Sequence, residues 1–177
     1  MKLISTENSL SNSAIWIVLL GGASILFSFA LACATPFPAL AALAALHMQR
    51  RDAYVVVAAT WLANQFIGYA FLHYPQNWDS FAWGAMIGIA SVAAVRTSLA
   101  SRSFVPQSVA THLVAFCAAF VTYEAVLYAT GILASDTGGF SMAIVGWILW
   151  VNALAFAGLL LIHGIGRTLG LATPATG

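Results

Sequence analysis

The chain has 177 residues, of which 62% are hydrophobic and only 6% are charged. Soluble domains carry roughly 25% charged residues, so this composition excludes a water-soluble globular protein and indicates an integral membrane protein. With six Lys and Arg residues and a net charge of +1, the chain cannot form the basic surface that binds nucleic acid.

Six apolar runs follow a polar lead of residues 1–13, which we interpret as a short cytoplasmic segment and not as a cleaved signal peptide. In chain order the runs cover residues 14–34, 36–48, 53–72, 81–95 (with an extension to 100), 109–132 and 142–169. A helix needs about 20 apolar residues to cross the hydrocarbon core. The second run is the shortest, and at about 1.5 Å per residue it reaches only about 20 Å.

The second run begins with a helix-start pattern, because Thr35 suits an N-cap and Pro36 suits the first turn. It is rich in alanine, and Ala41 and Ala45 form a small-xxx-small pair. Gly84 and Gly88 form a second such pair on the fourth run. These motifs let membrane helices approach closely, either inside one bundle or against a second membrane protein.

The positions of the basic residues along the chain distinguish a topology of five membrane spans from one of six. These residues are Lys2, Arg50, Arg51, Arg96, Arg102 and Arg167. If the second run crosses the membrane, all six lie on one side, and the connections at 35–36, 73–80 and 133–141 carry no Lys or Arg. The positive-inside rule therefore predicts an all-α bundle of six transmembrane helices over residues 14–169. Its second helix is short, both termini are cytoplasmic, and residues 170–177 form a cytoplasmic tail.

In this topology, polar and aromatic residues from several runs converge on the outer half of the bundle. Glu124 is the one acidic residue inside a span, and a lone carboxyl in lipid is expected either to bond neighbouring helices or to serve a ligand or a proton. For the amide side chains of Asn64, Gln65 and Asn152, hydrogen bonds between helices are the favoured explanation over contact with a ligand. The predicted substrate-binding set is Cys33, Asn64, Gln65, His73, Trp78, Trp83, Glu124, Tyr128, Trp147 and Asn152.

Histidines at the inner side offer a different chemistry. His47, His112 and His163 lie toward the inner ends of the second, fifth and sixth runs. His112 and His163 fall at matched depth on consecutive helices, an arrangement that suits a haem between two imidazoles, or a metal. The alternative is interfacial side chains that reach headgroup water. No protease, thiol-oxidoreductase or phosphate-loop motif is present, so we expect neither an enzyme nor ATP hydrolysis by this chain itself.

Six spans, no soluble domain, inner termini and an outward polar–aromatic pocket resemble the substrate-binding (S) components of energy-coupling-factor vitamin transporters. The resemblance covers the whole chain as architecture. In that family a small-xxx-small face contacts the transmembrane coupling subunit, which works with ATPases, and Ala41 and Ala45 are the best candidates for it here. Within the family the chain looks most like the small BtuM-type cobalamin transporters of Gram-negative bacteria. That likeness implies the bacterial inner membrane and cobalt ligation by Cys33, with His73 as the other outer-side candidate ligand.

Two functions therefore remain open from the sequence. The first is a transport protein that captures a small vitamin-like solute, such as cobalamin or a related corrinoid, and moves it into the cell without a cofactor of its own. The second is a haem-binding or redox membrane subunit that uses His112 and His163.

Overall fold

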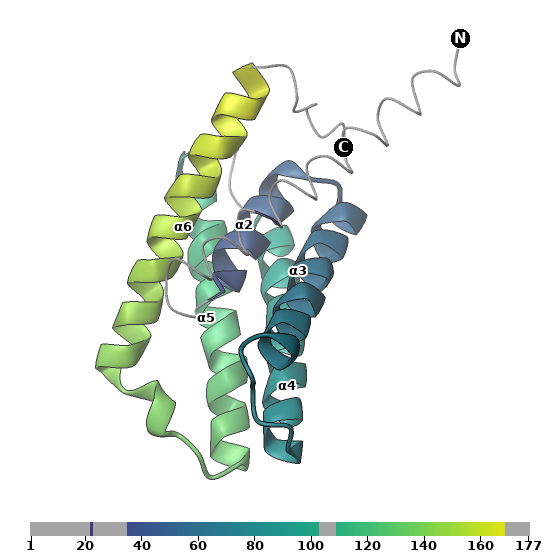
Figure 1. The fold of residues 1–177 in the computed structure, drawn as a ribbon. Coiled ribbons are helices and arrows are strands. Elements are labelled where there is room, and N and C mark those ends of the chain that lie inside the picture. Colours follow the sequence, from purple (N-terminus) through teal and green to yellow (C-terminus); the bar gives the residue numbers. More distant parts are fainter. Residues whose placement is uncertain (1–21, 23–34, 103–108, 169–177) are drawn as a thin grey trace.

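The computed structural model describes residue 22, residues 35–102 and residues 109–168 (Figure 1). The described chain forms helices α2 (Phe37–His47), α3 (Arg50–Ala70), α4 (Trp78–Ser101), α5 (Val109–Leu133) and α6 (Met142–Thr168), with a 3-10 turn η1 (Gly138–Phe140) before α6. No strand occurs in these residues, so the predicted all-α class is confirmed. Most of the first predicted span, with Cys33, lies outside the described residues.

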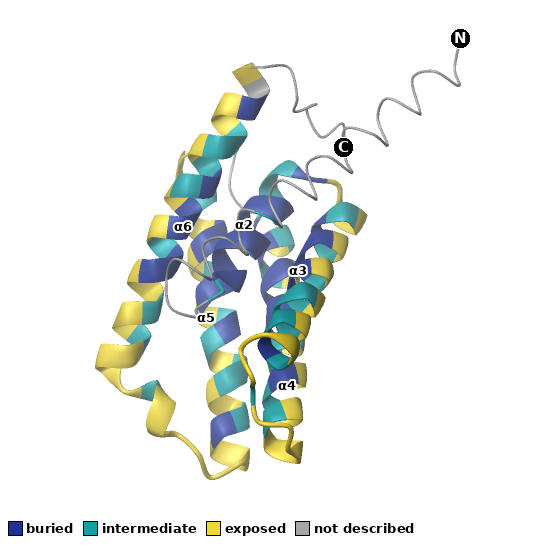
Figure 2. Ribbon diagram, viewed as in Figure 1, coloured by how far each residue is buried: buried dark blue, intermediate teal, exposed yellow. Residues whose placement is uncertain are grey.

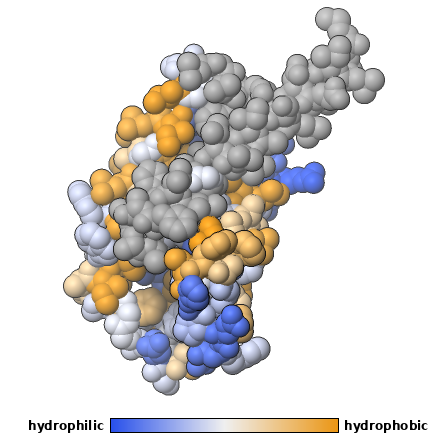
Figure 3. All heavy atoms as spheres, in the orientation of Figure 1, coloured by the Kyte–Doolittle hydropathy of each residue, from blue (hydrophilic) through white to orange (hydrophobic). Residues whose placement is uncertain are grey.

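Three of the described helices are long and apolar enough to cross a membrane, namely α4, α5 and residues Met142–Gly166 of α6. Their outward faces carry exposed large side chains such as Val121, Leu154 and Leu161, and hydrophobic surface is prominent in Figure 3. Such faces suit lipid and not water. The length and composition of these helices indicate a membrane protein, while the count of six spans stays a prediction.

Helix α3 has 21 residues but is less apolar than the other long helices. Its first turn contains Arg50, Arg51 and Asp52, and Asn64 and Gln65 interrupt its apolar sequence further along. Charged residues at one end suit the edge of a membrane, whereas two amides within the helix need polar partners.

Helix α2 lies at the centre of the bundle and packs against α3, α4, α5 and α6 (Figure 2). It has only 11 residues, and every side chain from Phe37 to Ala45 is buried. Ala41 and Ala45 have no exposed surface. The small-xxx-small pair therefore packs this helix inside its own bundle, and it is not available to a second membrane protein.

The start of α2 differs from the prediction in one detail. The helix begins at Phe37, and Pro36, not Thr35, occupies the N-cap position. The first turn has few free donors, because Pro38 has no N–H and the Phe37 N–H donates to the Thr35 carbonyl at 2.8 Å. The Thr35 hydroxyl is thereby left to bond a neighbouring helix.

The glycine pair of α4 packs against α3. The Trp61 Nε1–H donates to the Gly84 carbonyl at 2.8 Å, which fixes the indole across this face. A Cβ at Gly88 would lie 2.8 Å from Trp61 Cε2, closer than side chains approach in proteins. Small residues at this position are therefore required by the α3–α4 contact.

We expect Gly88→Ala to lower the thermal unfolding temperature of the detergent-purified protein, because the added methyl group overpacks the fixed Trp61 ring. Overpacking of this kind costs about 1–3 kcal/mol. Gly146→Ala on α6 is the matched control, since no atom lies within 4 Å of a Cβ there, and it should leave stability unchanged or slightly raised. Equal effects of the two substitutions would contradict the packing role of Gly88.

Candidate functional site

The shortness of α2 creates a cavity in the bundle. At about 1.5 Å per residue, α2 is about 16 Å long, whereas its neighbours α4, α5 and α6 are more than twice that length. Beyond its N-terminal end lies a cavity of about 400 Å³. Its walls are Thr35, Phe37, Asn64, Gln65, Tyr69, Tyr74, Ser80, Trp83, Gly84, Ile87, Tyr123, Glu124, Leu127, Asp136, Gly139, Phe140, Ile148 and Asn152.

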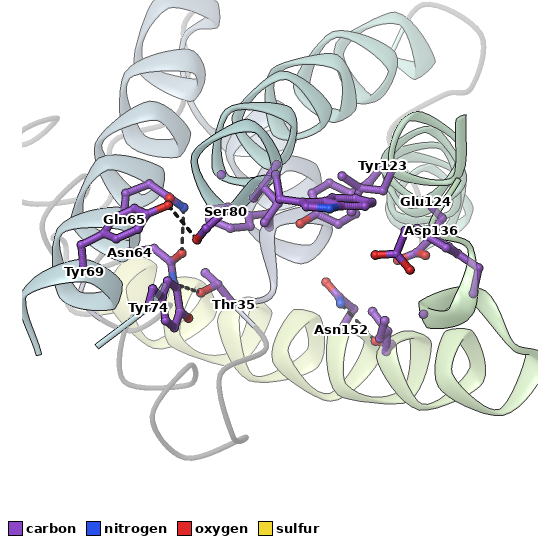
Figure 4. A pocket seen from close by; sticks show the side chains of 18 residues that line it. Thr35, Asn64, Gln65, Tyr69, Tyr74, Ser80, Tyr123, Glu124, Asp136 and Asn152 are labelled. Atoms are coloured by element: carbon purple, nitrogen blue, oxygen red, sulfur yellow. Dashed lines mark hydrogen bonds between the residues drawn. The ribbon is translucent and has the colours of Figure 1, made fainter. Parts of the chain in front are cut away.

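Hydrogen bonds orient the polar wall formed by α3 (Figure 4). The Asn64 Nδ2 donates to the Thr35 hydroxyl at 2.6 Å, and the Gln65 Nε2 donates to Asn64 Oδ1 at 3.3 Å. The Tyr69 and Ser80 hydroxyls lie 3.1 Å apart and link α3 to α4. These side chains are held in place before any solute enters, which lowers the entropy cost of binding one.

Asn152 joins α6 to the buried end of α2. Its Oδ1 accepts from the Ala39 N–H at 3.3 Å, and its Nδ2 donates to the Ile148 carbonyl at 3.0 Å. The side chain is 2% exposed. Because the first-turn N–H groups of a helix have no partner within the helix, this amide satisfies a donor that would otherwise be buried and unpaired.

Two sharp chain reversals bring further residues to the cavity. His73 and Ser135, just beyond α3 and α5, both have φ of 55°. The next residue in each case turns back onto its helix, with the Tyr74 N–H donating to the Gly68 carbonyl and the Asp136 N–H to the Gly131 carbonyl. A single residue in the left-handed backbone conformation is common directly after a helix. Here it places Tyr74 and Asp136 in the cavity wall.

The charge of the cavity wall is negative. Glu124 of α5 and Asp136 of the following loop both line it, and none of its described lining residues is Lys, Arg or His. Figure 4 shows Glu124 and Asp136 on the side away from Asn64 and Gln65. Glu124 Oε1 is buried and has no hydrogen-bond partner in the described part of the chain.

The structure brings five of the predicted substrate-binding residues to this one cavity, and they are Asn64, Gln65, Trp83, Glu124 and Asn152. Four others do not line it, namely His73, Trp78, Tyr128 and Trp147. Trp78 is 82% exposed and Trp147 is 60% exposed. The remaining candidate, Cys33, and with it the predicted cobalt contact, lies outside the described residues. Solute contact by any of these residues remains a prediction.

Several lining residues were not predicted as part of the site. Tyr69, Tyr74, Tyr123 and Phe140 supply aromatic wall, and Asp136 supplies the second carboxylate. Tyr69 follows Gln65 by one helical turn, a spacing that places both on one face. No comparable pattern marks Asp136 or Phe140, since their position depends on the turn that follows α5.

The predicted histidine pair is part of a three-helix contact. His47 Nε2 lies 3.3 Å from His112 Nε2, and the His47 ring stacks on His163 with centroids 4.0 Å apart. His47 thus contacts both histidines, and this close contact gives no support to a porphyrin between them. Among the described residues, no group of three or more His, Cys, Asp or Glu side chains has an arrangement that would hold a metal ion.

Comparison with known proteins gives no relative for this chain, because no family model, no curated protein and no solved structure matches it.

Asn152→Leu should destabilise the protein, since a side chain of similar size would leave the buried Ala39 N–H without its acceptor. An unsatisfied buried donor costs about 1–3 kcal/mol. The measurement is thermal unfolding in detergent, with Leu154→Ala as the control on the exposed face of α6, where Leu154 is 47% exposed. A leucine variant as stable as the parent would show that the Asn152 bond to α2 contributes little.

Proposed function

We propose that this chain is a membrane transport protein that binds a small vitamin-like solute in the cavity and moves it into the cell. The single observation that carries the proposal is the cavity itself, which lies at the end of a short central helix. Small-molecule sites have volumes of about 300–1,000 Å³ with aromatic walls and a few oriented polar groups, and this cavity of about 400 Å³ fits that description. Interrupted or short helices that end within the membrane are characteristic of solute sites in transporters.

Arginines support an outward orientation of the cavity. Arg50, Arg96 and Arg102 line one depression near the C-terminal end of α2, and the Arg102 Nη2 donates to the Met48 carbonyl at 3.1 Å. The cavity lies toward the opposite end, where Tyr74 and Asp136 of the helix connections line it. By the positive-inside rule, the arginines face the cytoplasm and the cavity faces outward. Six spans and a bacterial inner membrane are part of this proposal.

The likeness to S components of energy-coupling-factor transporters leads us to propose a transmembrane coupling subunit with ATPases as partner. Its docking surface would lie away from Ala41 and Ala45, because both are fully buried. A complete corrinoid is larger than a cavity of about 400 Å³. The present shape of the cavity therefore favours a smaller vitamin-like solute, and cobalamin would require the bundle to open further.

Labelling of single cysteines tests the topology. In a protein with Cys33 and Cys117 replaced by Ala, Gln76→Cys and Thr137→Cys should react with a membrane-impermeant maleimide in intact cells. Arg50→Cys and Ala100→Cys should react only after the membrane is permeabilised. Labelling of positions 50 and 76 from the same side would contradict the six-span arrangement.

A co-purifying solute tests the site. Protein purified from cells grown in rich medium should release a small molecule that mass spectrometry identifies, and this molecule should rebind to emptied protein. Trp83→Ala should weaken rebinding roughly thirtyfold, because truncation of a buried Trp contact costs on the order of 2 kcal/mol. Trp150→Ala is the matched control, since Trp150 is 58% exposed and does not line the cavity. Equal affinities of the two variants would place the solute elsewhere.

A further inference from the structure

We propose that the solute is an organic cation, a protonated amine, held between two carboxylates and a set of aromatic rings. This inference rests on the proposed function and specifies the chemical class of the solute. It follows from the charge of the cavity, the unpaired carboxylate oxygen, the aromatic wall and the hydrogen-bonded or missing N–H donors at the start of α2.

Glu124 and Asp136 are the charged residues that the structure describes in the cavity wall, and no arginine is among the described lining residues. Outside the described ranges, the sequence contains only two charged side chains, Lys2 and Glu7, apart from its termini. The arginines lie in the first turn of α3, near the C-terminal ends of α4 and α6, or directly after α4, and the proposed topology places these helix ends at the cytoplasmic side. They are Arg50, Arg51, Arg96, Arg102 and Arg167.

Glu124 has an acceptor that a cation would satisfy. Its Oε1 is buried without a partner among the described residues, and a buried polar atom left unpaired is costly. An ammonium group has several donors and a positive charge, so it pairs with such a carboxylate more strongly than a neutral donor does. The unpaired oxygen is thus explained by a ligand that supplies a cation.

Aromatic rings complete a cation site. Phe37, Tyr69, Tyr74, Trp83, Tyr123 and Phe140 all line the cavity. The face of an aromatic ring attracts a cation, and sets of such rings recognise quaternary ammonium groups. An apolar neutral solute would also fit these rings, but it would leave the two carboxylates without a counter-charge.

An anion would find little to bind at the end of α2. A helix N-terminus normally attracts anions through its free N–H groups. Here the Phe37 N–H donates to the Thr35 carbonyl, Pro38 has no N–H, and the Ala39 N–H donates to Asn152. With these donors used or missing, the carboxylates of Glu124 and Asp136 determine the sign of the preferred charge.

A second, smaller cavity extends the acidic region. It measures about 230 Å³ and shares Trp83 and Asp136 with the larger one, to which it adds Asp79 of the first turn of α4. A cation that approaches from this end therefore meets Asp79 and Asp136 before Glu124. Clefts lined by one sign of charge raise the local concentration of the opposite charge, so this smaller cavity suits the entrance of the site.

Three probes of similar size test the sign of the preferred charge. Benzylammonium carries a positive charge and three N–H donors, ethylbenzene is its uncharged isostere, and phenylmethanesulfonate carries a negative charge. Binding to purified protein, emptied of solute and held in detergent, is measured by equilibrium dialysis and by the rise in unfolding temperature that a bound ligand causes. We expect saturable binding of the cation and at least about tenfold weaker binding of the other two, the factor that one charge-assisted contact supplies.

Substitutions then assign the charge preference to the cavity. Glu124→Gln and Asp136→Asn should each weaken binding of the cation about tenfold while leaving ethylbenzene binding unchanged. Asp52→Asn is the matched control, because Asp52 lies in the first turn of α3 at the arginine end. If both cavity variants bind the cation like the parent protein, the proposed cation site is wrong.

The outcomes separate this inference from the proposed function. Preferential binding of the uncharged or the anionic probe, lost in Trp83→Ala, would overturn the cation inference and keep the cavity as a solute site. Failure of all three probes would also overturn it, while a co-purified solute that needs Trp83 would still support transport. A co-purified solute without positive charge would overturn the inference directly.

Discussion

The central helix α2 has only 11 residues, whereas the other α-helices that the structure describes have 21 to 27. The arrangement of the site depends on this difference in helix length. The start of α2 is buried in the bundle, where no water can satisfy a helix end, so each backbone group there needs a partner within the protein. The chain meets this requirement with prolines that lack an N–H, with the Thr35 carbonyl, and with the Asn152 amide. Because those partners are present, α2 can end inside the bundle and leave a cavity beyond it.

The same polar groups serve both stability and the candidate site. Asn64 and Gln65 are costly within a membrane helix, yet Asn64 is paired with the Thr35 hydroxyl, and Gln65 with Asn64. Asn152 supports the end of α2 and also lines the cavity. Glu124 differs, since its buried Oε1 has no partner in the described chain. A residue that bears this cost without an internal partner is a stronger indication of a ligand than a satisfied amide is.

Separation of charge along the bundle gives the molecule two chemically different ends. Arginines surround the end near Met48, whereas Asp79, Glu124 and Asp136 line the cavities toward the other end. No Lys, Arg or His is among the described lining residues of either cavity, so the carboxylates there have no counter-charge in the wall. The proposed topology places the arginines at the cytoplasmic side, and the carboxylates then favour cations that approach from the opposite side.

Composition and the lengths of the apolar runs were sufficient for the apolar character of the chain, the all-helical class, the approximate positions of the described helices and the short alanine-rich second helix, whose burial the sequence left open. These properties depend on local hydrophobicity, which each segment carries by itself. Depth along the membrane also identified Asn64, Gln65, Trp83, Glu124 and Asn152, because residues at one depth meet if their faces turn inward. Depth does not determine how each helix is rotated about its axis, so the exposed Trp78, Tyr128 and Trp147 were grouped with them.

Only the tertiary structure decided which faces turn inward, placed Tyr74 and Asp136 through two left-handed turns, and brought His47 against His112 and His163. Those features result from packing between segments far apart in the chain, and no single segment encodes them.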